Sequence, residues 1–189
     1  MNRLITIAIL LVHAGTLSAQ THLIPSEPIL SNDVRAGYYY TFGFGYGFGF
    51  GETEFPYTGY YYGATGVIGY QATRSIKTGF GFGYKMYDAG GLFPLYGQFR
   101  YSLWAKRIVP FFNADCGYLL SFEDFQAESR FFLSPSLGVH MVAKDRLSVN
   151  ISSGILQQSG GLYGTSSFWT FKLEVEFKGR AWNKFVIIK

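Results

Sequence analysis

Residues 38–51 read YYYTFGFGYGFGFG, a run in which aromatic residues alternate with glycine. The rings of this alternation are Phe42, Phe44, Tyr46, Phe48 and Phe50. Successive side chains of a β-strand point to opposite faces, so one face carries rings and the other only bare backbone. Glycine weakens an ordinary strand because it has no side chain to pack. We therefore expect large groups to lie across the bare face, and the aromatic face to contact lipid.

The composition is that of one apolar domain. The 189 residues include 19 Phe, 15 Tyr, 3 Trp and 24 Gly, and only 15% are charged, which excludes a disordered chain. The net charge of +4 comes from scattered basic residues, which argues against nucleic-acid binding. The single Cys116 allows no internal disulfide, and the His and Cys spacing fits no metal site. We expect no cofactor.

The first residues have the features of a secretory signal peptide. Arg3 supplies a positive charge, residues 4–12 (LITIAILLV) are apolar, and small residues precede position 20. This pattern predicts cleavage after Ala19, with cleavage after Ser18 as the alternative. A membrane-anchoring helix would need about 20 apolar residues, so we expect a signal peptide at 1–19 and strands in the membrane.

Seven further strand-like segments follow residues 38–51, and all but the first of them, which alternates poorly, separate an apolar from a more polar face. Each is long enough for a tilted strand to cross a bilayer, and an even number closes an up-and-down barrel with both ends on one side. We place these segments at 60–72, 76–87, 93–104, 108–121, 130–142, 146–158 and 166–178. The sequence therefore predicts an all-β fold, an eight-stranded antiparallel transmembrane β-barrel at 37–178. An irregular lead-in at 20–36 precedes it, and a tail at 179–189 follows.

The connections between the segments alternate in length. Short and mostly basic connections are expected at 73–75, 105–107 and 143–145, and longer ones at 51–59, 88–92, 122–129 and 159–165. Outer-membrane barrels have short periplasmic turns and longer outer loops. Both termini are therefore expected in the periplasm.

Alternation alone does not decide which face is inside, because soluble barrels alternate too. Eight strands enclose an interior just wide enough for side chains or one small ligand, and the large apolar side chains are too many to fit there. We therefore expect a lipid-facing set that includes Phe42, Phe44, Tyr46, Phe48, Phe80, Phe82, Phe171, Leu173 and Val175. The faces of 60–72 stay unassigned.

The opposite face predicts a polar lumen, closed by ion pairs rather than open as a pore. Buried charges need partners, because an unpaired one costs several kcal/mol. The expected lumen network is Lys77, Lys85, Arg100, Asp115, Lys172, Glu174 and Glu176, with the four bases balancing the three acids. The glycines within 43–51 and 79–83 leave room for these side chains. Pro135 interrupts a strand, and we expect a bulge there.

Aromatic girdles are expected at the two membrane interfaces. The periplasmic girdle would contain Tyr38–Tyr40, Tyr101 and Trp104, and the outer girdle Tyr60–Tyr62, Tyr84, Tyr118 and Trp169.

Several short motifs resemble a known group of proteins. They are Gly69-Tyr-Gln71, Gly79-Phe-Gly-Phe-Gly83, Phe93-Pro-Leu95 leading to Phe99-Arg-Tyr101, and Pro135-Ser-Leu-Gly-Val139. With them, residues 37–178 resemble the small eight-stranded outer-membrane β-barrel proteins, OmpA- and OmpX-like in architecture, and especially the outer membrane protein β-barrel domain group common in Bacteroidetes. The resemblance implies an outer-membrane location in a Gram-negative cell. The segment Phe171-x-Leu-x-Val-x-Phe177 resembles the terminal aromatic signal of such barrels, although residues 179–189 follow it.

Three functions are compatible with this sequence. The first is a non-catalytic barrel with a structural or surface-interaction role, embedded as a monomer in outer-membrane lipid. Its outer loops, which contain Phe55, Tyr57, Glu123, Asp124 and Glu128, would contact a partner. The second is a lipid-modifying enzyme similar to lipid A deacylases, for which His140 with Ser134 or Ser136 would be the candidate residues. The third is a narrow ion or solute pore, or a soluble ligand-binding barrel. We expect no enzyme.

Overall fold

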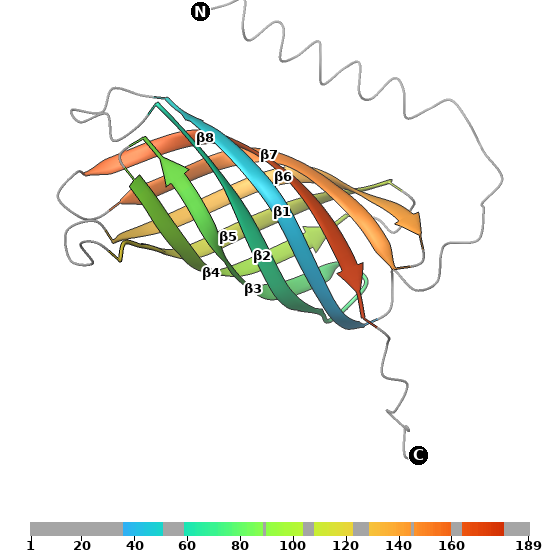
Figure 1. Cartoon of the computed structure of the whole chain (residues 1–189). Helices are drawn as coiled ribbons and strands as arrows, with labels where there is room; N and C mark the ends of the chain where they lie inside the picture. Colours follow the sequence, from blue (N-terminus) through green and yellow to red (C-terminus); the bar gives the residue numbers. More distant parts are fainter. Residues whose placement is uncertain are drawn as a thin grey trace, which may run out of the picture.

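A computed structural model describes residues 36–50, 59–88, 90–103, 108–122, 129–144, 146–159 and 164–179. These residues form eight antiparallel strands that close into a barrel (Figure 1). The strands are β1 (Gly37–Gly49), β2 (Tyr60–Gln71), β3 (Ile76–Tyr87), β4 (Gly90–Ser102), β5 (Ile108–Leu120), β6 (Arg130–Lys144), β7 (Leu147–Ser159) and β8 (Thr165–Lys178). The predicted eight-stranded antiparallel barrel is confirmed.

Some predictions fall on residues outside these ranges. They concern the signal peptide, the lead-in before residue 36, the tail after residue 179, Trp104 and the loop residues named above. Within the described ranges, no helix has the length and apolarity needed to span a membrane.

Each strand pairs with its neighbour in sequence, and β1 closes the ring by pairing with β8. Gly43, for example, lies opposite Thr65 of β2 on one side and Glu174 of β8 on the other. We call the end at which β1 begins and β8 ends the terminal end, and the opposite one the distal end (Figure 1). A closed ladder leaves no strand edge without a partner, which is the condition for a sheet to reside in lipid.

One connection is shorter than the sequence analysis expects. β4 begins at Gly90 and pairs that residue with Tyr87, so the connection between β3 and β4 is reduced to residues 88–89 and the expected loop at 88–92 is wrong. Gly90 has φ of 137°, a backbone conformation that favours glycine. Glycine was taken as a loop signal here, whereas it allows the chain to reverse sharply.

The expected bulge at Pro135 is also wrong. The pairs Leu133–Gln157 and Ser136–Gly154 keep the same register on either side of it, while Pro135 itself pairs only with Ala114 of β5. The missing N–H of proline is accommodated by a local gap in the ladder with β7. The register shift of this strand pair lies instead between Val142 and Lys144.

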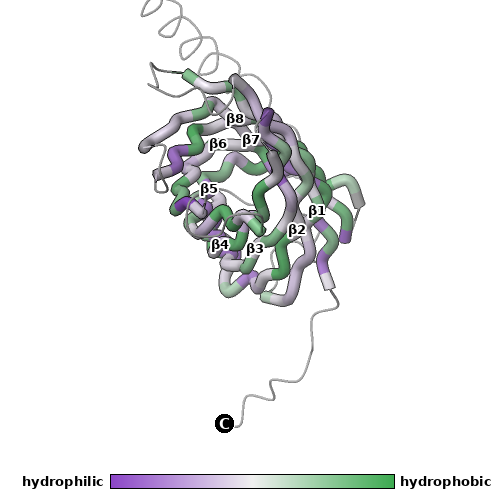
Figure 2. The backbone as a smooth tube through the Cα atoms, turned by 60° about the vertical axis from the view of Figure 1, so that its left-hand side comes forward, coloured by the Kyte–Doolittle hydropathy of each residue, from purple (hydrophilic) through white to green (hydrophobic). Residues whose placement is uncertain are grey.

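Hydrophobic and hydrophilic residues alternate along the strands (Figure 2), and their burial shows that they lie on opposite faces. The predicted lipid-facing residues all lie on the outer surface, where Phe44 is 61% and Phe80 56% exposed, while Val175 is half-buried. In β2, whose faces were unassigned, Tyr60 and Tyr62 point outward and Tyr61 and Gln71 point into the lumen.

Two residues expected in the girdles lie inside the barrel. Tyr39 and Tyr61 are each the middle residue of three consecutive tyrosines, and each is almost fully buried. Neighbouring residues of a strand cannot share a face. The three tyrosines of each run therefore split, with two outside and one in the lumen.

Candidate functional site in the barrel lumen

A charged network fills the lumen toward the terminal end. Lys77 of β3 donates to Glu176 of β8 over 2.5 Å between Nζ and Oε1. Arg100 of β4 contacts two acids, with Nη2 at 2.7 Å from Glu174 Oε2 and Nη1 at 3.3 Å from Glu176 Oε2. All four side chains are buried. Three strands are therefore tied across the lumen by charge-assisted hydrogen bonds, which are stronger than neutral ones.

Three further residues support this network. Asn150 of β7 directs Nδ2 toward Glu174 Oε2 and Glu176 Oε2, each at 3.4 Å. Its Oδ1 is then left as an acceptor, 2.6 Å from Nδ1 of His140, so this ring nitrogen carries the proton. Phe111 lies under the guanidinium of Arg100, with 4.4 Å from Cζ to the ring centroid. The network is thus held in one geometry by amide, imidazole and aromatic contacts.

A second ionic group occupies the middle of the lumen around Asp115 of β5. Lys172 Nζ lies 2.5 Å from Asp115 Oδ2, and Oδ1 accepts from Gln98 Nε2 at 3.2 Å and Asn113 Nδ2 at 2.8 Å. Both carboxylate oxygens are therefore engaged.

Lys85 departs from the expected pairing of four bases with three acids. Across the described ranges it forms no ion pair; its Nζ lies over the rings of Tyr61 and Phe132, at 4.7 and 5.1 Å from their centroids. Its contacts are cation–π contacts.

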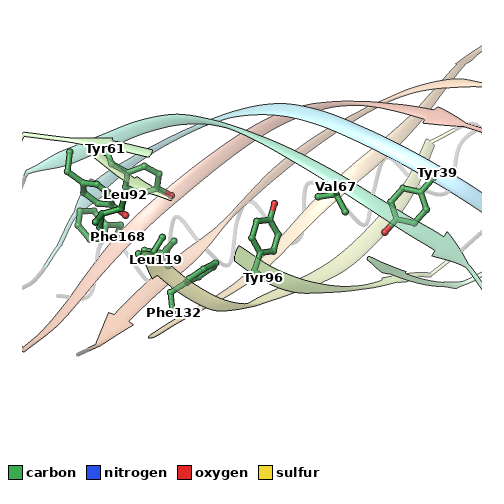
Figure 3. Close-up of a cluster of buried hydrophobic side chains, with 10 residues drawn as sticks. Tyr39, Tyr61, Val67, Leu92, Tyr96, Leu119, Phe132 and Phe168 are labelled. Atoms are coloured by element: carbon green, nitrogen blue, oxygen red, sulfur yellow. The ribbon is translucent and has the colours of Figure 1, made fainter. Parts of the chain in front are cut away.

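Apolar side chains fill the lumen toward the distal end, where the sequence analysis expects polar ones. We call this set the distal cluster, and Figure 3 shows several of its members gathered together. The distal cluster consists of Tyr61, Tyr87, Leu92, Leu119, Phe132, Leu156 and Phe168. The ring of Tyr61 contacts those of Phe168 and Tyr87 with centroids 5.4 and 5.3 Å apart. The prediction of an ionic plug therefore describes only part of the lumen.

The glycines of β1 and β3 make room inside the barrel, as expected, but largely for rings. A Cβ at Gly47 would overlap the ring of Tyr61, and one at Gly81 the ring of Tyr96. At Gly43 a Cβ would lie 2.7 Å from Glu174 Cγ. One bare face thus accommodates both the aromatic and the charged parts of the lumen.

Neither a metal site nor a catalytic triad is assembled by the described residues. No group of three His, Cys, Asp or Glu side chains in these ranges could hold a metal ion. Ser134 and Ser136 share the inner face of β6 with His140, but neither hydroxyl has a hydrogen-bond partner within these ranges.

Comparison with known proteins finds similarity in structure. No protein-family model matches the chain, and no curated protein matches it by sequence. The crystal structure of Neisserial surface protein A matches with a TM-score of 0.58 and 11% identity over 77% of this chain and 99% of that one. The outer membrane protein OprG from Pseudomonas aeruginosa matches with a TM-score of 0.52 and 10% identity over 79% and 99%. The chain has the fold of the small outer-membrane barrels. At these identities the likeness concerns the fold alone.

All seven residues of the expected lumen network lie in the lumen of this fold, and the structure joins six of them by ion pairs. The sequence analysis missed Asn150 and Gln98 as bridging residues, and Phe132 and Phe168 as lumen-filling rings. The alternation of faces along a strand could have placed all four residues in the lumen, because residues an even number of positions apart share a face. Phe168 is an even number of residues from Lys172, and Phe132 from Ser134, so each lies on the inner face of its strand.

Proposed function

We propose that this chain is an integral outer-membrane protein whose barrel crosses the membrane with both termini in the periplasm. One observation supports the proposal: a closed barrel carries large apolar side chains over its outer surface and buries its charges in the lumen. Its strands have 12–15 residues, more than the about 9–11 that a tilted strand needs to cross a bilayer. A soluble barrel would have the reverse arrangement.

The tyrosines near the two ends of the barrel agree with this placement. Tyr38 packs against Tyr70 at the terminal end with ring centroids 5.3 Å apart, and Tyr46 stacks on Tyr60 at the distal end at 6.3 Å. All four rings are exposed. Amphipathic rings at these two levels fit the two interfaces of a bilayer.

The proposed role is structural or one of surface interaction, without catalysis and without conduction. His140 is 3% exposed and faces the lumen, so a lipid outside the barrel would not reach it. The charged network and the distal cluster together obstruct the path along the barrel axis. We further propose a monomer that contacts a surface partner through its outer loops.

Cell fractionation tests the location. The protein is expected in the outer-membrane fraction, and after detergent extraction it should migrate faster on a gel when unheated than when boiled. A matched pair of variants sharpens the test: Phe44→Leu should insert as the parent does, whereas Phe44→Arg places a charge on the outer face and should impair insertion. Recovery of the parent protein in a soluble form without detergent would refute the proposal.

The single cysteine provides a test that needs no substitution. Cys116 is exposed on the outer face of β5, opposite Gly97 of β4 and Leu133 of β6. A water-soluble maleimide should modify it in urea but not in lipid vesicles, because the hydrocarbon would cover the thiol. Equal modification in both conditions would contradict a lipid-facing surface.

Two measurements test the absence of conduction and of catalysis. Planar-bilayer recordings should show no steady conductance from the parent protein, and a stable open channel would overturn the closed lumen. Replacement of His140 by Ala should leave the lipid A of the cell unchanged, and loss of a lipid A modification would favour the enzyme instead.

A further inference from the structure

Lys85 is a buried basic residue that forms no ion pair with any acid of the described ranges. Its side chain comes from β3 into the middle of the lumen and is 5% exposed. Among the described residues its contacts are the faces of two rings, those of Tyr61 and Phe132. A lysine removed from water in this way keeps its charge only when another charge or strong dipole compensates for it, and otherwise gives up its proton.

Asp115 does not supply that compensation in full. It lies across the same part of the lumen, but its Oδ2 contacts Lys172 Nζ at 2.5 Å. Its Oδ1 accepts from the amides of Gln98 and Asn113. The carboxylate of Asp115 is therefore engaged by Lys172 and two amides, and with both lysines protonated the group of Lys85, Lys172 and Asp115 carries an excess of one positive charge.

A small cavity lies between these residues. Lys85, Lys172 and Asp115 line it together with Thr65, Tyr61 and Tyr96. It has room for about one particle of the size of a water molecule. The ammonium of Lys85 is the main donor that faces such a particle, because the side chains of Thr65 and Tyr96 hydrogen-bond to each other.

We propose that this cavity binds one monovalent anion of the size of chloride, with the Lys85 ammonium as its main partner and Lys172 as the second cation nearby. The anion neutralises the excess charge of the Lys85, Lys172 and Asp115 group. Phosphate and carboxylate metabolites are excluded by size. The inference depends on the lumen alone and goes beyond the proposed membrane role, so a failure of one does not imply failure of the other.

Crystallography of the full-length protein with bromide tests the proposal directly. Crystals grown in bromide in place of chloride should show an anomalous peak in the cavity, in contact with Lys85 Nζ. This experiment uses the parent protein, so its result does not depend on whether a variant folds. A cavity that is empty or that contains only a water molecule would overturn the proposal.

A solution experiment gives an independent readout. In vesicles or detergent, replacing gluconate, which is too large for the cavity, by chloride at about 100 times the dissociation constant should raise the thermal midpoint by about 5 °C. The rise should saturate with chloride concentration. An unchanged midpoint of the parent protein would refute the site.

Two variants separate this site from a general effect of salt. Lys85→Met removes the ammonium but keeps most of the length of the side chain, and should abolish the chloride-dependent rise. Lys178→Gln removes another buried lumen cation, whose Nζ already contacts Gln71 Oε1 at 2.8 Å, and should retain the rise. The same response to chloride in Lys85→Met as in the parent would overturn the assignment.

Discussion

The terminal and distal ends of the lumen are built from the same eight strands but are filled differently. Toward the terminal end, Lys77 and Arg100 reach Glu174 and Glu176 through hydrogen bonds with defined directions. Toward the distal end, rings such as Phe132 and Phe168 pack with their neighbours in the distal cluster. Buried side chains occupy the lumen toward both ends, so filling an interior of this size requires volume and not one particular polarity.

The comparison also shows what the ionic end adds. The pair Lys77–Glu176 joins β3 to β8, and Arg100 joins β4 to the same strand. Moving one strand by one residue would turn its own side chains to the outside and break its ion pairs with the other strands. We infer that the ionic end fixes the register of distant strands, whereas the distal cluster mainly contributes apolar packing.

The largest effect is expected from breaking the ionic end. Replacing Arg100 by Met leaves Glu174 without its cation and should lower the free energy of unfolding by about 3–5 kcal/mol. Urea titration of the protein in lipid vesicles measures this loss. In the double variant Arg100→Met with Glu174→Gln, the loss should be smaller, because the unpaired charge is gone. Losses that simply add would contradict a coupled pair.

A smaller effect is expected from emptying the distal end. Phe168→Ala removes a buried ring from the distal cluster and should cost about 3 kcal/mol in the same titration. Phe168→Leu keeps most of the volume and serves as the control, with an expected cost of about 1 kcal/mol. A cost for Phe168→Ala no larger than that of the control would mean that the distal end is not tightly packed.

Between the two ends, the bare face of β3 can be tested at Gly81. A methyl group there would overlap the ring of Tyr96, so Gly81→Ala should cost about 2 kcal/mol. Gly97→Ala is the matched control, since its new methyl would point outward with its nearest neighbour, Cys116 O, at 3.9 Å. Gly97→Ala should leave the unfolding midpoint nearly unchanged. Equal costs at the two sites would show that the ring moves aside freely.

The smallest effect distinguishes two buried tyrosines. Tyr39 donates to Gln98 Oε1 at 3.3 Å, whereas no hydrogen bond of the Tyr61 hydroxyl is found within the described residues. Tyr39→Phe should therefore cost about 1 kcal/mol, and Tyr61→Phe close to nothing. Urea midpoints of the two variants, compared side by side, measure the difference. A larger loss at Tyr61 would reverse the contrast between the two ends.

Much of the fold follows from strand periodicity. The opening run and the seven strand-like segments after it predict eight strands. The alternation in β1 and β8 predicts the outward side of Phe44 and Phe171, because so many large apolar side chains cannot fit inside a barrel of this size. The turn at Gly90 escaped prediction, since glycine marks both long loops and sharp reversals. How the strand tolerates the missing N–H of Pro135 depends on its pairing with the two neighbouring strands. The sequence around Pro135 does not contain that information.

The sequence predicts which charged residues face the lumen, but not which of them contact each other. Parity identifies Lys85, Arg100 and Glu174 as inward-facing residues. Strand parity does not give the position of a residue along the barrel axis. That position decides that Arg100 forms an ion pair with Glu174, while Lys85 lies over two aromatic rings. The expectation that inward residues are polar also failed for Phe132 and Phe168. Volume, rather than polarity, is what an eight-stranded interior demands.

The position of the acids in the chain has a consequence for assembly. Glu174 and Glu176, the acids that pair with Lys77 and Arg100, are both on β8, the strand that closes the ring against β1. Until β8 docks, neither base has its carboxylate, and contacts this distant in sequence form slowly. Closure of the ring and neutralisation of this end of the lumen are therefore a single event, and an unfinished barrel would keep two uncompensated cations in its interior.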